Sequence, residues 1–564
     1  MADYSKAHIC QCLSRISTVC RNSPVTISGG RRKTGAQFVQ GVLNLARGLL
    51  QLGLQRGDVV AISALNSDLY LEWLLAVSYA GGVTAPLNYR WSLEEASEAM
   101  AVARPTLLVT DSTLNVWHSN FHIDSISSLR WHVIMDIPLG VKSTWTGLNT
   151  EMLKSHYNLC LATDYCWAPE GAAVICFTSG TTGRPKGVTL SHSALLVQSL
   201  AKIAIVGYGE DDVYLHTAPL CHIGGISSAM AVLMSGGCHI FMPKFDAGLA
   251  VESINHYDIT SLITVPTMMA DLVSFYSRKG APGRSETVKK ILNGGGALSV
   301  ELITQAAKIF PRAKLFSAYG MTEACSSMTF MTLYDPTKGS VRQQLQLNVG
   351  GNSKFSDQQK GICVGKPAPH VELKVCSEGS SHIGRILTRG SHVMLGYWGR
   401  ISNETFKFVG DNWLDTGDIG HIDDNGNMWL IGRSQGQIKS GGENVYPEEV
   451  EAVLSQHTGV SANVVIGLPD SRLGEMVVAC IQLRGNWQWD DLRSNPSSIS
   501  YPANYLSADI LRCFCKEKQL TRFKVPKKFI LWRNQFPVTT TGKIRREQLK
   551  AEVMSTMQLM PSKL

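Results

Sequence analysis

Apolar residues recur along the chain with two different spacings. Stretches with apolar residues three and four positions apart, such as 36–54, predict helices, while short continuous apolar runs, such as 58–63 and 106–111, predict buried strands. The same alternation recurs from 170 to 330. Helices that alternate with buried strands are typical of an α/β fold with a largely parallel sheet. We therefore expect layered α/β structure over most of the chain.

The pattern changes twice in the second half of the chain. Residues 335–360 lose the apolar period and predict an exposed loop, and 361–432 contain shorter strands with a hairpin turn at Asp424–Gly426. Mixed α/β character then resumes. The length of 564 residues exceeds the roughly 250–300 residues of a single core. We expect a large N-terminal domain over 1–433 and a small C-terminal domain over 434–564.

Composition and charge narrow the class of protein. The chain is 44% hydrophobic and 17% charged, which is typical of soluble globular proteins, and no window reaches the roughly 18 apolar residues of a membrane span. The net charge of +8 forms no basic run, so we expect no nucleic-acid partner. The 14 cysteines are scattered without a C-x-x-C pair, which favours a reducing compartment and gives no zinc site.

One segment, FTSGTTGRPKGVTLSH from Phe177 to His192, is rich in glycine and hydroxyl residues. Glycines let the backbone approach a ligand closely, hydroxyls add donors, and Lys186 adds a mobile positive charge, which together suit a polyphosphate. The Walker A spacing is absent. On composition alone, the segment is either a phosphate-binding loop or a flexible surface turn. The candidate binding residues are Thr178, Ser179, Gly180, Thr181, Thr182, Gly183 and Lys186.

Seven further motifs occur along the chain: PLNYRWS (86–92), PLCHIGG (219–225), NGGGALS (293–299), AYGMTEA (318–324), WLDTGDIG (413–420), GRSQGQIKSGGENVYPEEVE (432–451) and TTTGKIRR (539–546). Together with the glycine-rich segment, they resemble in content and order the motifs of the adenylate-forming superfamily. That superfamily includes acyl-CoA synthetases, the adenylation domains of peptide synthetases and beetle luciferases. The resemblance spans nearly the entire chain.

The resemblance implies a fold and a reaction. The implied fold is α/β, with a large N-terminal domain of α/β layers plus a distorted β-barrel subdomain, and a small mobile α+β C-terminal domain. The implied reaction joins a carboxylate to AMP from ATP, with release of pyrophosphate, and then transfers the acyl group to the thiol of CoA. Because the chain ends about twenty residues after Lys543, CoA is favoured over a fused carrier domain as the acceptor.

The resemblance also implies nucleotide-site residues. Tyr319 resembles the aromatic residue that stacks on adenine, Thr322 the hydroxyl near the α-phosphate, and Glu323 the carboxylate that holds Mg²⁺. Taken alone, Tyr319 could be a core residue and Glu323 part of a solvated turn. Asp418 resembles the acceptor of both ribose hydroxyls, and Arg433 the base that reaches the same ribose. Bare backbone near adenine or the acyl group is implied at Gly294, Gly295 and Gly296, and Gly320 of AYGMTEA is a further candidate nucleotide-binding residue.

Two lysines divide the implied mechanism. Lys543 matches the residue that bridges the carboxylate and the α-phosphate during adenylation. Lys439 lies in the segment presented to the site in the second half-reaction, although an exposed surface lysine is the alternative interpretation. The two segments would alternate by rotation of the small domain. His222 matches a position beside the activated carboxylate, or it is a structural histidine. Gln435 departs from the Asp or Lys usual at the hinge.

Within the superfamily, the motifs look most like those of plant 2-succinylbenzoate–CoA ligases, which act in phylloquinone synthesis. Such a substrate is a dianion, and Ser227, Ser228 and Thr267 join His222 as candidate partners of its second carboxylate. A 4-coumarate or medium-chain acyl-CoA ligase would share every motif. A luciferase-like oxygenase or a non-catalytic nucleotide-binding relative is the alternative of a different class, although a non-catalytic relative should have lost Lys543 or Glu323.

The chain ends in Ser562, Lys563 and Leu564, the tripeptide that the peroxisomal import receptor reads. We therefore expect a peroxisomal location, with an unstructured tail as the alternative interpretation. The N-terminus lacks an apolar signal region and carries an early Asp3, unlike a transit peptide. Import into the chloroplast as well is left open, although the family core begins close to residue 8 and leaves little room for a cleavable peptide.

Overall fold

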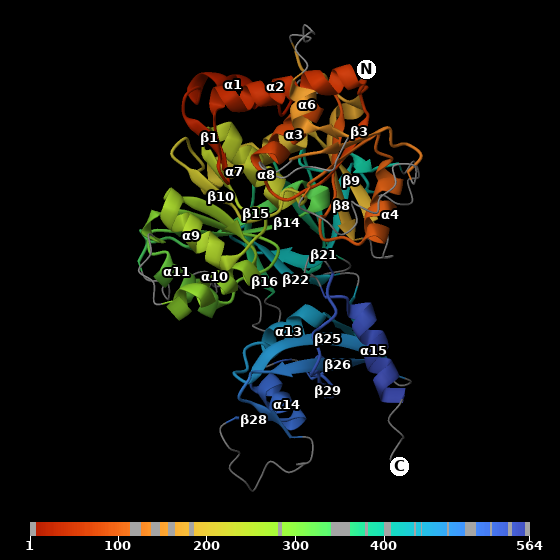
Figure 1. The fold of residues 1–564 in the computed structure, drawn as a ribbon. Coiled ribbons are helices and arrows are strands. Elements are labelled where there is room, and N and C mark those ends of the chain that lie inside the picture. The colour runs from red at the N-terminus through yellow and green to blue at the C-terminus, as the bar shows by residue number, and fades with distance from the viewer. Residues whose placement is uncertain are drawn as a thin grey trace. The chain divides into compact units, whose positions relative to one another are not determined.

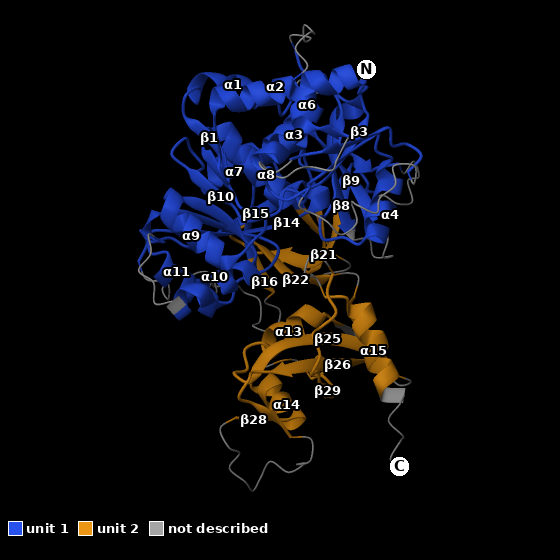
Figure 2. Cartoon of the chain, in the orientation of Figure 1, with its two compact units in different colours: residues 1–351, 364–373, 388–414 blue, residues 352–363, 374–387, 415–564 orange. Residues whose placement is uncertain are grey.

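The structure is a computed structural model that forms two compact units (Figures 1 and 2). Unit 1 comprises residues 1–351, 364–373 and 388–414, and unit 2 comprises 352–363, 374–387 and 415–564. The described residues are 7–112, 126–136, 147–155, 164–179, 185–279, 285–339, 344, 361–377, 382–399, 408–433, 436–440, 443–470, 473–490, 504–518, 520, 522–539 and 544–558. The expected division at 433/434 remains a prediction.

The first sheet of unit 1 has the strand order β19-β9-β8-β4-β3-β5-β6-β7. The run from β8 through β4, β3, β5 and β6 to β7 is parallel, and β9 returns antiparallel to β8. The bounds are β3 Val59–Ser63, β4 Val83–Pro86, β5 Leu107–Thr110, β6 Trp131–Ile134, β7 Leu148–Asn149, β8 Ala172–Ser179, β9 Pro185–Ser191 and β19 Gly396–Tyr397.

The second sheet of unit 1 follows the order β15-β14-β13-β12-β10-β11-β1-β2. The run from β14 to β1 is parallel, and β15 and β2 are antiparallel to their neighbours. The bounds are β1 Pro24–Ser28, β2 Arg31–Thr34, β10 Val213–His216, β11 Cys238–Phe241, β12 Ser261–Thr264, β13 Lys290–Asn293, β14 Lys314–Met321 and β15 Ser326–Tyr334.

Helices cover both faces of this second sheet, as Figure 1 shows. Leu215, Leu262 and Ile291 pack with apolar residues of α9, α10 and α11. An adjacent residue of each strand points to the opposite face, where Tyr214, Ile263 and Leu292 pack with α7 and α8. Burial on both faces explains why these strands are continuous apolar runs in the sequence. The bounds are α7 His192–Val206, α8 Ile223–Ser235, α9 Ala247–Tyr257, α10 Pro266–Lys279 and α11 Val300–Ile309.

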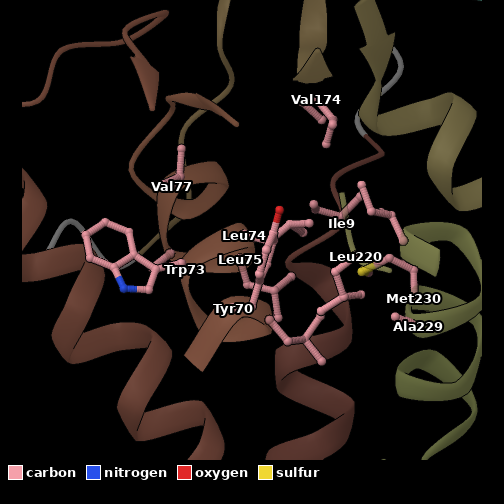
Figure 3. Packing of buried hydrophobic residues seen from close by; sticks show 14 of the residues in the cluster. Ile9, Tyr70, Trp73, Leu74, Leu75, Val77, Val174, Leu220, Ala229 and Met230 are labelled. Atoms are coloured by element: carbon pink, nitrogen blue, oxygen red, sulfur yellow. The ribbon is translucent and has the colours of Figure 1, made fainter. Parts of the chain in front are cut away.

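The remaining helices of unit 1 are α1 Gln11–Val19, α2 Gly35–Leu52, α3 Asp68–Tyr79, α4 Leu93–Ala103 and α6 Thr150–Lys154. Helix α2 begins at a capping box between Thr34 and Gln37 and ends at Gly53, whose φ of 93° is left-handed. Every residue of α3 is buried, and Figure 3 shows its Tyr70, Leu74 and Leu75 in one cluster with Met230 of α8. This burial accounts for the short apolar stretch around 70–83. Among the described residues, no helix is long and apolar enough to cross a membrane.

A buried ion cluster joins β2, α3 and α6. Glu72 is fully buried and receives Lys33 Nζ at 2.6 Å on one oxygen and Lys154 Nζ at 2.7 Å on the other. Asp68, one turn earlier, pairs with Lys33 at 2.7 Å and with Arg31 at 2.9 Å. The two carboxylates and three bases therefore stabilise one another inside the apolar layer, where a single unpaired charge would be costly.

Glu72→Ala is expected to lower the free energy of unfolding of unit 1 by about 3–5 kcal/mol, because Lys154 then keeps only Glu151, at 3.6 Å. Arg15→Ala is the control, since its bond to Glu210 joins two exposed side chains and should be worth less than about 1 kcal/mol. Thermal unfolding followed by circular dichroism measures both. Equal transition midpoints for the two variants would contradict the prediction.

Unit 2 contains the predicted hairpin and a smaller sheet. Strands β21 (Trp413–Ile422) and β22 (Met428–Arg433) pair antiparallel around a turn in which Asp423 accepts from the backbone of Asn425 and Asn427, so the predicted hairpin is confirmed. The smaller sheet has the order β24-β23-β26-β25, with β29 beside β26. Its bounds are β23 Ile438–Ser440, β24 Glu443–Val445, β25 Val460–Asp470, β26 Gly474–Leu483 and β29 Lys528–Leu531.

The other elements complete the chain. Helices α13 Pro447–Leu454, α14 Ala508–Glu517 and α15 Arg546–Gln558 belong to unit 2, as does the pair β27 Gln488–Trp489 and β28 Tyr505–Leu506. Besides β19, the described residues between β15 and β21 form four shorter strands. They are β16 Ile362–Pro367, β17 Glu372–Cys376, β18 Gly384–Arg389 and β20 Phe408–Val409. The prediction of a mixed α/β fold is confirmed. The predicted loop 335–360 lies largely outside the described residues.

Candidate functional site

Four neighbouring parallel strands of the second sheet end at one edge, and several of the predicted site residues follow those ends. His222 comes after β10, Thr267 after β12, Gly294 after β13, and Thr322 directly after β14. In open α/β sheets, ligands bind outside the carboxyl ends of the strands. The fold therefore brings together residues that are up to 100 positions apart in the sequence.

The glycines after β13 form a stretch of bare backbone at this edge. Gly294 N donates to Thr264 O at 2.9 Å, and Asn293 Nδ2 donates to Gly296 O at 2.7 Å. Gly295 has a φ of +74°, which favours glycine. A Cβ added at Gly294 would meet no atom within 4 Å. The backbone is open at Gly294, while a Cβ at Gly295 would meet Val265 at 3.4 Å and one at Gly296 would meet Pro266 at 3.1 Å.

A tight turn over residues 322–325 joins β14 to β15, and Tyr319, Gly320 and Met321 pair with β15 directly before it. The register shifts after Tyr319, and a Cβ at Gly320 would overlap the carbonyl oxygen of Ser326. Cys325 and Ser326 have φ values of 52° and 99°, which are unfavourable for residues with side chains. The short helix η4 (Thr322–Ala324) lies inside this turn. Backbone in rarely used conformations is concentrated at binding and catalytic sites.

Glu323 is buried in η4 and has a defined partner. Tyr397 Oη donates to Glu323 Oε1 at 2.9 Å, and the backbone N–H of Met394 donates to Glu323 O at 2.8 Å. The ammonium of Lys186 lies 5.4 Å from the centre of the Tyr397 ring, a cation–π arrangement. Tyr397 therefore links the glycine-rich segment to the AYGMTEA motif. Sequence reasoning did not find Tyr397, because no motif contains it.

Strands β8 and β9 hold the two ends of the glycine-rich segment. They pair antiparallel, with Thr178 opposite Lys186 and Ser179 opposite Pro185. Gly180, Thr181, Thr182 and Gly183 lie outside the described residues. Lys186 is half-buried. Strand β9 therefore places Lys186 beside Tyr397, the residue whose hydroxyl contacts Glu323.

His222 is the N-terminal cap of α8, and its carbonyl accepts from the backbone N–H groups of Gly225 at 3.0 Å and Ile226 at 3.1 Å. The side chain of His222 is half-buried. Ser227 and Ser228 follow on the same helix and are fully buried. Their hydroxyls accept from Lys202 Nζ of α7 at 2.6 Å and 3.0 Å.

Asp418 and Arg433 are opposite one another on the β21–β22 hairpin of unit 2. Arg433 Nε lies 3.3 Å from Asp418 Oδ1, with the Arg433 side chain 60% exposed and that of Asp418 12% exposed. The buried carboxylate can accept and the exposed guanidinium can donate hydrogen bonds to one polar group of a ligand. The backbone of Lys439 belongs to β23, opposite Asn444, and Lys543 and Gln435 lie outside the described residues.

Comparison with known proteins agrees with this geometry. The AMP-binding enzyme family matches residues 15–398, and the AMP-binding enzyme C-terminal domain matches residues 449–543. The "2-succinylbenzoate--CoA ligase, chloroplastic/peroxisomal" of Arabidopsis thaliana is 54% identical over 580 residues, which cover 100% of both chains.

Two solved structures of the o-succinylbenzoate CoA synthetase of Bacillus subtilis are also similar. The complex with its acyl-adenylate intermediate is 25% identical with a TM-score of 0.73, covering 96% of this chain and 97% of that one. The complex with ATP and magnesium ion is 25% identical with a TM-score of 0.74, covering 96% and 99%.

Proposed function

The chain belongs to the AMP-binding enzymes, and we propose that it is an ATP-dependent ligase that converts 2-succinylbenzoate to 2-succinylbenzoyl-CoA through an acyl-adenylate. The observation that carries the proposal is the 54% identity, from end to end, with the Arabidopsis enzyme of that name. Because the identity extends over the full length of both chains, it includes the parts of the sequence that each half-reaction requires. The product would serve phylloquinone synthesis.

In the first step, an oxygen of the succinyl carboxylate attacks the α-phosphorus of ATP and pyrophosphate leaves. In the second step, the CoA sulfur attacks the acyl carbon and AMP leaves. Tyr319 would stack on adenine, Thr322 would donate to the α-phosphate, and Asp418 would accept the ribose hydroxyls beside Arg433. The open backbone at Gly294 and the strained turn around Thr322 support these roles.

The acidic group at the site fits a magnesium ion. A carboxylate has about four lone-pair positions, and the Tyr397 hydroxyl occupies one of those of Glu323. Mg²⁺ prefers such oxygen ligands and usually shares them with substrate phosphates. Glu323 would hold the ion, which when bound neutralises phosphate charge. Lys186 and the hydroxyls of the glycine-rich segment would bind the β- and γ-phosphates.

The lysines and the hinge have proposed roles in the same reaction. Lys543 would bridge the two anionic groups during adenylation, and Lys439 would act in thioester formation with His222 beside the carboxylate. The small domain over 434–564 would rotate between the two steps at the hinge near Gln435. These roles rest on the family motifs.

We also propose that the chain is imported into the peroxisome through Ser562, Lys563 and Leu564. The Arabidopsis relative is named chloroplastic/peroxisomal, which supports this location and a chloroplast location alike. A fluorescent fusion at the N-terminus that leaves the last three residues free should enter peroxisomes, and removal of Leu564 should abolish that import.

A substrate panel tests the activity. With ATP, Mg²⁺ and CoA, we expect fast CoA-dependent AMP release with 2-succinylbenzoate and at most about 1% of that kcat/KM with 4-coumarate or octanoate, since these acids lack the second carboxylate and leave its partners unpaired. Liquid chromatography of the thioester confirms the product. A preference for coumarate or octanoate would reject the proposed substrate and leave an AMP-forming ligase of another acid.

A further inference from the structure

Lys202 of α7 is a fully buried lysine in unit 1. Its ammonium donates to Ser227 Oγ at 2.6 Å and Ser228 Oγ at 3.0 Å on α8. A third bond, at 3.4 Å, reaches Ser326 Oγ at the start of β15. Within the described ranges, Lys202 contacts hydroxyl oxygens and no carboxylate. This differs from Glu72, whose buried charge is paired with two lysines.

An ammonium in this environment is energetically unfavourable without an anion. Burial lowers the pKa of Lys202 to about 7, with an opposing contribution from the Cys325 thiol beside it. Burying a charge without an opposite charge is costly, because hydroxyl groups replace only part of the lost hydration. Each serine hydroxyl that accepts from Lys202 also carries a proton that it can donate, and in this structure Ser228 also bonds Tyr214 and Ser326 lies 3.4 Å from Ser327. Lys202 and the three serines are thus a group of donors around one positive charge.

The position of this group relates it to the candidate site. Ser227 and Ser228 follow His222 by five and six residues, which is about 8–9 Å along a helix. Ser326 follows Glu323 by three residues in the strained turn. Ala201, next to Lys202, packs in the same apolar cluster as Tyr319. Lys202 therefore lies between the helix that begins at His222 and the strand that follows the AYGMTEA motif.

Resting on the proposed function, we propose that Lys202, with Ser227, Ser228 and Ser326, binds the second carboxylate of the dianionic acid, the one that is not activated. Six bonds of about 1.5 Å separate the two carboxyl carbons of 2-succinylbenzoate, which gives a span of about 7 Å when extended. That span is close to the distance along α8 from His222 to the two serines. The acid would thus lie with its reacting carboxylate at the strand ends and its ring carboxylate at Lys202.

The binding of that carboxylate explains why a lysine is retained at a buried position. A carboxylate beside the ammonium favours the charged form of Lys202 and supplies the missing opposite charge. An acid without the second carboxylate would leave the ammonium buried and unpaired, and would bind poorly. Lys202 would therefore determine which acids are accepted, while it takes no part in the bond-making steps.

Two acids that differ by one carboxylate test the proposal on the full-length enzyme. 4-Oxo-4-phenylbutanoate has the same succinyl chain as 2-succinylbenzoate and lacks the ring carboxylate. For Lys202→Met, we expect kcat/KM with 2-succinylbenzoate to fall about 10²- to 10³-fold, mostly through KM, and kcat/KM with 4-oxo-4-phenylbutanoate to stay within about threefold of wild type or to rise. Lys308→Met, which removes an exposed lysine of α11, is the matched control and should change neither value.

The outcomes separate the possible roles of Lys202. An equal loss with both acids would mean that Lys202 only joins α7, α8 and β15, and it would overturn the proposal, as would an unchanged preference. If Lys202→Met does not fold, Lys202→Gln retains donors to Ser227 and Ser228 without the charge, and the same split between the two acids is expected. A wild-type enzyme that does not use 2-succinylbenzoate would instead reject the proposed function itself.

Discussion

Gly320→Ala is expected to lower both the stability of unit 1 and the rate of acyl-adenylate formation. The added methyl group would overlap the carbonyl oxygen of Ser326, so β14 and β15 must separate locally. Such overpacking costs about 1–3 kcal/mol. The movement would displace Thr322 and Glu323, and a displacement of about 1 Å at reacting groups can cost on the order of 10²-fold in rate. Thermal unfolding and pyrophosphate exchange measure the two effects.

Gly294→Ala is the matched control for this variant. The position is open to space and has no left-handed φ. The substitution should therefore change the free energy of unfolding by no more than a surface mutation does, about 0.5 kcal/mol. If the backbone at Gly294 is a wall of the substrate site, as proposed, KM for ATP or for the acid should still rise. A stable, fully active Gly320→Ala enzyme would show that the turn does not fix the site.

The apolar pattern predicted the elements of unit 1 well where burial alone determines them. The apolar run AAVICFTS predicts a strand and coincides with β8 (Ala172–Ser179), and the pattern VELITQAAKIF predicts a helix over 300–310, where α11 spans Val300–Ile309. The apolar run HIFMPKF predicts a strand over 239–245, but β11 ends at Phe241, because Pro243 follows and cannot donate to a ladder. Strand ends depend on such local chemistry more than on the apolar period.

The parts of the site that the sequence did not disclose are contacts between distant positions. Tyr397 is 74 residues from Glu323, and Lys202 is 124 residues from Ser326. Neither residue belongs to a motif, and a lysine in an apolar helix is ordinarily read as a surface residue. One local signal was available, since α7 is apolar around most of its circumference, which indicates a buried helix and hence a buried Lys202.

The motifs thus predict residues that would handle ATP, while the proposed selection of the acid depends on packing between elements. Ser227 and Ser228 were candidate partners of the second carboxylate from the sequence, but hydroxyls alone do not neutralise a carboxylate. The structure adds the charge, because Lys202 reaches both hydroxyls from α7. On the proposal made for Lys202, the acid specificity would be a property of the contact between α7 and α8.

The final prediction concerns the division of the reaction between two lysines. Attack of a carboxylate on the α-phosphate brings two anions together, and a placed ammonium lowers that repulsion most in the transition state. The second step, attack of the CoA thiol on the acyl carbon, brings no second anion to the phosphorus. Lys543→Ala should therefore slow adenylation on the order of 10²- to 10³-fold, while thioester formation from supplied 2-succinylbenzoyl-AMP stays within about threefold.

Single-turnover measurements of each half-reaction test this division. Lys550→Ala is the control for loss of one positive charge from unit 2, since Lys550 pairs with Glu475 at 3.2 Å on a partly exposed surface, and it should leave both steps unchanged. Lys439→Ala should show the reverse of Lys543→Ala, with adenylation retained and thioester formation slowed. Equal losses in both steps for Lys543→Ala would mean that one arrangement of the small domain serves both reactions, and the proposed rotation near Gln435 would then have no mechanistic role.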